Sequence, residues 1–149
     1  MRRALLLSTV LLLTACGGGE DDKAAFVEEA TAVCEKASTD SEALKTPASP
    51  AEFAPYAESI VRIAEQAQQD LEKLDLPEAD REDLESRVIE PFADVVAAGQ
   101  AFAEKVKAAG EDQAKLLPLL SQVPDSGDVD IEYLREYGLE TCADVISQE

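Results

Sequence analysis

The chain of 149 residues has no histidine and no tryptophan, and its single methionine is the initiator, Met1. Without imidazole it cannot build a Ser-His-Asp or Cys-His catalytic group, a histidine-ligated haem or the usual zinc sites. The few aromatic residues argue against sugar recognition by stacking. No glycine-rich phosphate loop is present, because the glycines at 17–19 follow no predicted strand. We therefore expect no cofactor and can assign no catalytic residue.

Basic residues are scarce: 13 Lys and Arg stand against 32 Asp and Glu, for a net charge of −19. Proteins bind nucleic acids through Lys and Arg that neutralise phosphates, so we expect no nucleic-acid partner. With so many carboxylates, any chosen pair is a coincidence until burial shifts a pKa, so the pairs do not predict acid–base catalysis. The acidity is typical of a solvated surface, and a specific acidic docking face is the alternative.

The first fifteen residues differ from the rest of the chain. Arg2 and Arg3 supply positive charge, and an apolar run over 4–13 is broken only by Ser8 and Thr9. The run has about ten residues, whereas a transmembrane helix needs about 20. A positive start, a short apolar run and small residues after it predict a secretory signal peptide over residues 1–15.

Leu13-Thr14-Ala15-Cys16 ends this segment and resembles the lipobox of bacterial lipoproteins. The resemblance implies cleavage before Cys16 and a diacylglyceryl group on its thiol, and two acyl chains anchor a protein stably. It implies a lipid-anchored protein on the extracytoplasmic face of a bacterial membrane. The alternative is an ordinary secretory peptide with an incidental cysteine.

The remainder of the chain divides into a spacer and one domain. Residues 16–22, rich in glycine and acidic side chains, predict a flexible tether. Residues 23–149 are long enough for a single domain and too short for two ordinary ones. Without Arg2 and Arg3, 11 basic residues face 32 acidic ones, so the mature protein carries a net charge of −21.

If Cys16 carries lipid, Cys34 and Cys142 are the remaining cysteines of an exported domain. Two cysteines outside the cytoplasm usually pair, and this pair closes a loop of about 109 residues, for a stabilisation of about 4–5 kcal/mol. The alternative is a reactive or metal-binding thiol pair. It lacks both C-x-x-C spacing and a histidine.

The sequence of the domain predicts helices throughout, since helix-forming residues predominate and no alternating strand pattern or hairpin signal occurs. Apolar residues at spacings of three and four indicate helices over about 22–38, 50–76, 80–110, 111–123 and 128–146. Within 50–76, Pro55 indicates that a short turn comes first and that the main helix starts near Pro55. We expect an all-α fold: an irregular up-down bundle of four to five helices, whose disulfide joins the first helix to the last.

Local signals refine the helix ends. Ser49 and Glu52 frame a predicted capping box, and Asp80 is expected to cap the third helix. Gly138, with an apolar residue after it, predicts a helix stop. Pro91 interrupts the third helix, where its ring clashes with the carbonyl four residues earlier. The resulting kink either shapes a pocket or bends the helix around the core.

Acidic residues alternate over 125–132, where they could converge on calcium. The spacing does not match an EF-hand loop, because no glutamate stands at the required distance beyond Gly127. Capping of the next helix by Asp128 or Asp130 explains the same residues.

Tyr137-Gly138-Leu139-Glu140-Thr141-Cys142, together with the upstream helical cysteine, is similar to a pattern in small alanine-rich lipoproteins of high-GC Gram-positive bacteria. The resemblance covers two short stretches and implies a helical domain without a known activity.

We therefore expect a membrane-anchored, non-catalytic helical domain with a protein-interaction or structural role at the cell envelope. Its partners would be the membrane, through the lipid on Cys16, and an envelope protein that the sequence does not identify. The alternative is a module that binds a small ligand or a divalent cation, in a pocket near Pro91 or in the loop over 125–132. An enzyme ranks third.

Overall fold

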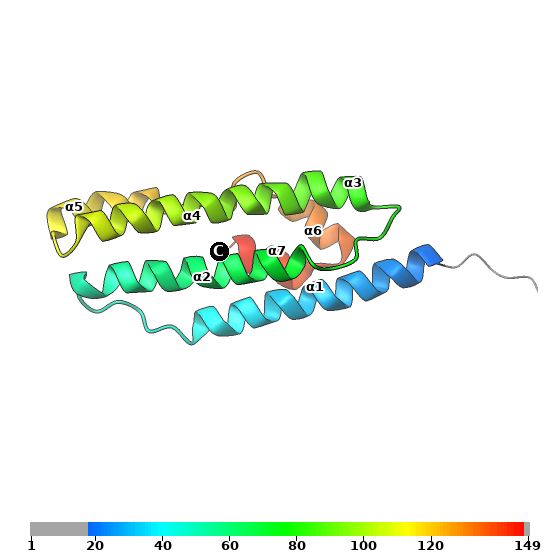
Figure 1. Cartoon of the computed structure of the whole chain (residues 1–149), viewed down its shortest axis with the longest axis horizontal. Coiled ribbons are helices and arrows are strands. Elements are labelled where there is room, and N and C mark those ends of the chain that lie inside the picture. The colour runs from blue at the N-terminus through cyan, green and yellow to red at the C-terminus, as the bar shows by residue number, and fades with distance from the viewer. Residues whose placement is uncertain (1–17, 148–149) are drawn as a thin grey trace, which may run out of the picture.

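The computed structural model describes residues 18–147, and its regular secondary structure over this range is entirely helical. Three long helical segments run along the bundle, with α2 in contact with both of the others (Figure 1). They are α1 (Gly18–Glu42), α2 (Phe53–Leu71), and a continuous segment of α3 (Arg81–Leu84), η2 (Glu85–Ile89) and α4 (Glu90–Ala109). The shorter helices are α5 (Gln113–Leu119), α6 (Ile131–Tyr137) and α7 (Glu140–Ser147). The predicted all-α bundle is confirmed.

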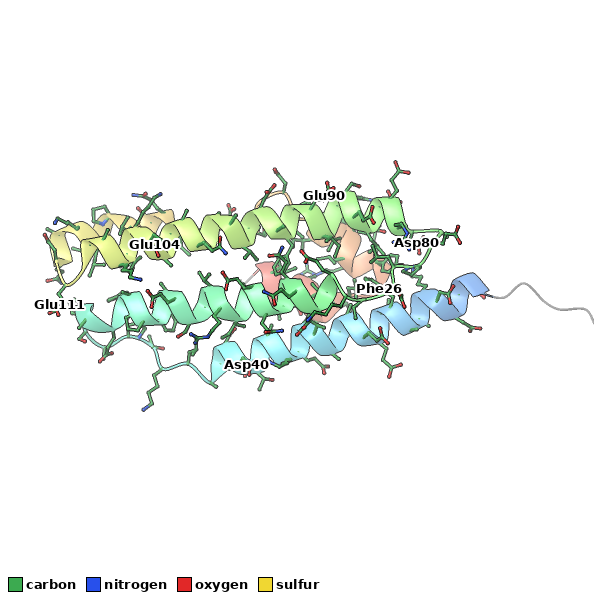
Figure 2. All side chains as sticks on the ribbon, in the orientation of Figure 1. Phe26, Asp40, Asp80, Glu90, Glu104 and Glu111 are labelled. Atoms are coloured by element: carbon green, nitrogen blue, oxygen red, sulfur yellow. A yellow bond between two sulfur atoms is a disulfide. The ribbon has the colours of Figure 1, made fainter. Side chains whose placement is uncertain are left out.

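Buried apolar side chains form two clusters. The larger one joins α1, α2, α3, η2, the start of α4, α6 and α7, and its most enclosed members are Ala30, Leu84, Leu134 and Ala143. The smaller one gathers Val106 and Ala109 of α4 with Leu116 of α5, against the start of α2. The clusters lie toward opposite ends of the molecule, which Figure 2 marks by Asp80 at one end and Glu111 at the other.

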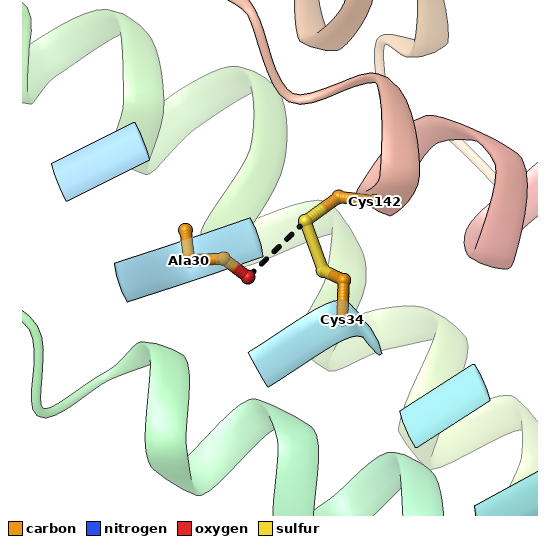
Figure 3. The surroundings of a disulfide bond; sticks show 3 residues. All are labelled: Ala30, Cys34 and Cys142. Atoms are coloured by element: carbon orange, nitrogen blue, oxygen red, sulfur yellow. Dashed lines mark hydrogen bonds between the residues drawn. A yellow bond between two sulfur atoms is a disulfide. The ribbon is translucent and has the colours of Figure 1, made fainter. Parts of the chain in front are cut away.

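The predicted disulfide is present and joins Cys34 in α1 to Cys142 in α7 across 108 positions of sequence (Figure 3). Both cysteines are buried in the larger cluster. The sulfur of Cys142 lies 3.5 Å from the carbonyl oxygen of Ala30. A disulfide sulfur carries no proton to donate, so this is a packing contact. The bond fastens α7, the last helix of the described chain, to the middle of α1.

The first helix is longer than the sequence indicated. It begins at Gly18, so residues 18–22, expected to be a flexible tether, are its opening turn. Glu20 and Asp21 lie in that turn, where carboxylates favour a helix through its dipole. The helix continues to Glu42, past the expected end at residue 38. Cys16 and the predicted signal peptide lie outside the described residues.

The short turn expected before the second helix is present, but the capping there and the end of the helix differ from expectation. Ser49 makes no side-chain capping bond; instead the Glu52 carboxylate accepts the backbone N–H of Ala48 at 2.7 Å, and the 3₁₀ turn η1 (Pro50–Glu52) precedes α2. The capping-box prediction was wrong because Glu52 reaches one residue further back. α2 ends at Leu71, five residues early, where the Leu74 N–H bonds the Leu71 carbonyl at 3.1 Å and tightens the chain into a turn.

Pro91 is accommodated by a wide helical turn. In η2 the Glu90 N–H bonds the carbonyl of Glu85, five residues back. The Arg87 carbonyl, which Pro91 cannot satisfy, accepts the backbone N–H of Asp130 at 3.0 Å. Figure 1 shows α3 and α4 running on as one rod. The wide turn thus replaces the expected kink and ties this helix to the loop before α6.

The predicted stop after Tyr137 is confirmed in detail. Gly138 has φ of 102°, the Leu139 N–H bonds the Leu134 carbonyl at 2.8 Å, and the Gly138 N–H bonds the Arg135 carbonyl at 3.1 Å. This pair of bonds is a Schellman motif. Leu139 is then buried in the larger cluster, and the reversal of the chain brings Cys142 back to α1.

Candidate functional site

An apolar cleft of about 420 Å³ lies between α2 and α4, in the half of the bundle that contains α5. The two helices are antiparallel, so the start of α2 faces the end of α4. From α2 the lining residues are Phe53, Tyr56, Ala57, Ile60, Val61 and Ala64. From α4 they are Val95, Val96, Gly99, Phe102 and Val106.

The cleft exists because one face of α2 is only partly covered. Along α2 the fully buried residues are Ala67 and Leu71, which pack in the larger cluster. All the lining residues from Phe53 to Ala64 are apolar or aromatic and remain half-buried. Helix α7, which shares the larger cluster with Ala67 and Leu71, ends midway along the bundle (Figure 1). An apolar helix face in half of the molecule is therefore only partly covered.

A short segment after α4, which we call the strap (residues 112–124), forms one wall of the cleft. It comprises the capping residue Asp112, α5, the 3₁₀ turn η3 (Leu120–Gln122) and the two residues that follow. Asp112 caps α5 by accepting the N–H of Ala114 at 3.0 Å. Leu116 is buried and anchors the strap to the end of α4. Thr46 and Pro47, from the linker between α1 and α2, also line the cleft.

The outer side of the strap is apolar as well. Leu117 and Val123 are each 59% exposed and Leu120 is 48% exposed, the large hydrophobic residues that stand out most at the surface of the described chain. Leu120 and Val123 also line the cleft, so its rim is a hydrophobic surface. This apolar surface contrasts with the acidity of the chain as a whole.

Two polar bridges join α2 to α4 alongside the cleft. Nζ of Lys107 lies 2.9 Å from a carboxylate oxygen of Glu58, and the Gln100 amide donates to Glu65 at 2.6 Å. The hydrogen bond to Glu58 raises the pKa of Lys107, and the nearby charge adds to the effect. These bridges hold the two helices in register while their charged atoms stay outside the cleft.

The lining determines which ligands the cleft can accept. It contains no charged side chain, and its only side-chain oxygens are the hydroxyls of Thr46 and Tyr56. Transferring a charge there without a partner would be costly, so the enclosed part of any ligand is uncharged. Gly99 leaves room in the wall: a methyl group there would lie 3.6 Å from Cγ2 of Val61, an ordinary contact.

The cleft is not where the sequence placed a pocket. It begins at Val95, about one helical turn beyond Pro91, and Pro91 does not line it. The signal that could have located it is Gly99, a small residue in a helix stripe of large apolar ones. Val95, Gly99 and Phe102 have the helical spacing of core residues, and nothing local shows that the opposite wall stops short.

The acidic residues over 125–132 do not converge on a cation site. Asp125 accepts the N–H of Gly127 at 3.0 Å, within its own turn. Asp130 caps α6 by accepting the Tyr133 N–H at 2.9 Å, and it pairs with Arg87 at 2.6 Å. The bond from Tyr133 and then the one from Arg87 lower the pKa of Asp130. Over residues 18–147 no group of three side chains is arranged to hold a metal ion.

Asp80 was expected to cap α3, but it makes no capping bond and instead accepts the hydroxyl of Tyr137 at 2.7 Å. Burial and this bond raise the pKa of Tyr137. Nζ of Lys23 lies 3.9 Å from the centre of the Tyr137 ring, which meets Phe26 edge-on. This cluster fastens α1 and α6 to the turn before α3, and the sequence did not reveal it because its members lie far apart in the chain.

Comparison with models of protein families, with curated proteins and with solved structures finds no match for this chain. None of the helices within residues 18–147 combines the length and the apolar character that crossing a membrane requires.

Proposed function

We propose that this protein is a lipid-anchored, non-catalytic protein of the bacterial cell envelope, and that its cleft between α2 and α4 binds a small apolar ligand. The observation that carries the proposal is the cleft itself: about 420 Å³, lined without a charged residue, on a strongly acidic protein. Its volume is within the range of about 300–1,000 Å³ typical of small-molecule sites.

The location in the envelope rests on the sequence. Leu13-Thr14-Ala15-Cys16 resembles a lipobox, and a disulfide such as Cys34–Cys142 is typical of exported proteins. An exported domain that meets lipids and other apolar molecules has a use for an apolar binding site. We assign no chemical step to the protein. Hydrogen bonds lower the pKa values of the carboxyl groups of Asp70 and Asp130, whereas a general acid requires a raised pKa.

The proposal is tested with diphenylhexatriene, an uncharged rod-shaped probe that fluoresces in apolar surroundings. The mature chain from residue 16 onward, carrying Cys16→Ala, is used, because it lacks both the lipid attachment site and the apolar run over 4–13 and so avoids detergent. We expect saturable fluorescence at one site per chain. Gly99→Leu should abolish or strongly weaken it, since the new side chain would project from the wall at Gly99 and obstruct the cleft.

Ala98→Leu is the matched control. It adds the same side chain one residue earlier on the same helix, at an exposed position outside the cleft. Binding to this variant should equal that of the unsubstituted helix, and circular dichroism should show that both variants are folded. An absence of fluorescence, or equal binding by Gly99→Leu and Ala98→Leu, would contradict the proposal.

A second candidate function, contact with an envelope protein, is favoured by the exposed Leu117 on the strap. Leu117 does not line the cleft, so the two candidates can be separated. A photo-crosslinking residue at position 117 should give one discrete adduct in intact cells, and the same residue at Ala98 should give none. No adduct at position 117, or an equal mixture at both positions, would argue against a protein partner there.

A further inference from the structure

The strap is held to the bundle by few polar contacts. Its side-chain bonds are local: Asp112 pairs with Lys115 at 3.5 Å, and Ser121 donates to the Pro118 carbonyl at 2.9 Å. Among the described residues, its one backbone hydrogen bond to a residue outside it runs from the Asp112 N–H to the Ala109 carbonyl at 3.3 Å. The strap therefore depends on apolar contacts for its position.

Those apolar contacts centre on one buried side chain. Leu116 packs against Val106 and Ala109 of α4, and no other strap residue is buried. Helix α5 has seven residues, too few for stability on its own, and Pro118 lies inside it. Helix α7 is about as short, but the disulfide at Cys142 fastens it. A segment with one buried anchor and exposed backbone bonds opens at a lower free energy than the core does.

Both ends of the strap adjoin fixed points. Gly110, with φ of 59°, ends α4, and its N–H bonds the Val106 carbonyl at 3.2 Å. Gly127, with φ of 58°, follows the other end, and beyond it the Asp130 N–H bonds the Arg87 carbonyl at 3.0 Å. Glycine occupies positive and negative φ about equally well, so the backbone can change direction at both places. The strap can thus move between them while the bundle stays in place.

Two strap residues indicate the direction of that movement. Leu120 and Val123 both line the cleft, yet both are exposed. A shift of the strap further over the cleft would bury them against an apolar occupant, which supplies the surface for them to pack on. Burial of apolar surface is favourable, so an occupant would draw the strap closed.

We infer that the strap is a lid, hinged near Gly110 and Gly127, that closes over an apolar ligand in the cleft and opens to release it. The inference rests on the proposed function and adds how the site retains its ligand. Leu116 is the latch, because its contacts with α4 are the ones that opening must break. The lid therefore opens without the unfolding of α2 or α4.

Hydrogen exchange by NMR tests the lid first without ligand, on the mature chain with Cys16→Ala. The amides of Leu116 and Leu120, toward the two ends of α5, bond the carbonyls of Asp112 and Leu116. Both should show one common protection factor, at least about tenfold below that of Ala67 in α2. A graded loss from one end would indicate fraying, and protection equal to that of Ala67 would mean that the strap opens only with the whole bundle. Either result would overturn the lid.

A matched pair of variants tests the latch. Leu116→Ala removes the buried anchor, so exchange throughout the strap should accelerate about thirtyfold or more. Leu117→Ala makes the same change one residue later, at an exposed position outside the cleft, and should stay within about twofold of the parent. Circular dichroism should show that both variants are folded. Equal exchange in the two variants would overturn the latch and, with it, the lid.

Diphenylhexatriene then tests closure. At about ten times its Kd the probe should slow exchange of the strap about tenfold, since a lid that closes over the probe must release it to open. If the probe binds and slows exchange in α2 but leaves the strap unchanged, the strap does not close over the ligand. The inference then fails while the proposed function stands. If the probe does not bind at all, the proposed function fails and the lid fails with it.

Discussion

Removal of the Cys34–Cys142 disulfide should destabilise the protein more than any other small change. The bond joins residues 108 positions apart, so the unfolded chain loses much of its freedom when it is closed. The chain-entropy model gives about 4.7 kcal/mol for a loop of that size. Single domains are stable by about 5–15 kcal/mol, so the bond accounts for a third or more of the total.

The substitution should be Cys34→Ala together with Cys142→Ala. Both cysteines are buried, at 4% and 3% exposure, so serine would add buried hydroxyls and confuse the result. For a domain of this size 1 kcal/mol corresponds to about 3–4 °C, so the Tm measured by circular dichroism should fall by about 15 °C. The unsubstituted protein, melted under reducing conditions, should unfold at nearly the same temperature as the double variant.

The loss should be concentrated at α7. This helix has eight residues, too few for stability on its own, and it contacts α1 and α6. Hydrogen exchange in the double variant should therefore accelerate in α7 before it does so in α2 and α4. A change in unfolding free energy below about 1 kcal/mol would refute the entropy argument. Unchanged exchange in α7 would refute the role of the bond in holding that helix.

Three further predictions concern separate features. Gly138→Ala should cost about 1–2 kcal/mol in chemical unfolding, because φ is 102° there, whereas Gly19→Ala, in a helical turn with open space around it, should not destabilise the protein. The pKa of Tyr137 is raised on folding, so this residue contributes stability below about pH 10 that is lost as pH rises further. Tyr137→Phe should make the melting temperature depend less on pH between about pH 9 and pH 11. An unchanged dependence on alkaline pH would contradict the Asp80 contact. Mass spectrometry of the membrane fraction should find a diacylglyceryl group on Cys16 at the new N-terminus, and Cys16→Ser should carry no lipid and keep residues 1–15; an unmodified Cys16 would contradict lipid anchoring.

Features that depend on neighbouring residues could be predicted from the sequence. Gly138 and Leu139 predicted a helix stop, and the structure has both bonds of a Schellman motif there. Cys34 and Cys142, the remaining cysteines of a domain expected to be exported, were predicted to pair, and the structure contains the bond. The capping-box prediction was wrong because the Glu52 carboxylate accepts the N–H of Ala48 and not that of Ser49. Residue type does not determine which of two adjacent N–H groups a carboxylate accepts. The prediction that residues 18–22 form a flexible tether was wrong, because polar residues are as well exposed to water in a helix as in a coil.

Contacts between distant residues could not be predicted. Asp80 and Tyr137 meet across 57 positions, and Arg87 and Asp130 across 43. Each acidic residue had an equally good local interpretation as a helix cap, which Asp130 fulfils and Asp80 does not. Whether each aspartate caps a helix or binds a distant side chain depends on which groups the fold brings near it. Here those groups meet because α6 packs against the start of the third long segment.

The sequence by itself determined the helices, the disulfide pair and the surface charge, because each follows from residue types and short spacings. Only the tertiary structure decided that a binding cleft exists. The lining residues of α2 and α4 have the spacing of ordinary core residues, and in the half of the bundle with α7 such residues are core. In the other half α7 has ended and the strap covers the groove only in part. The same apolar pattern is therefore core where a third element fills the groove and a cleft where none does.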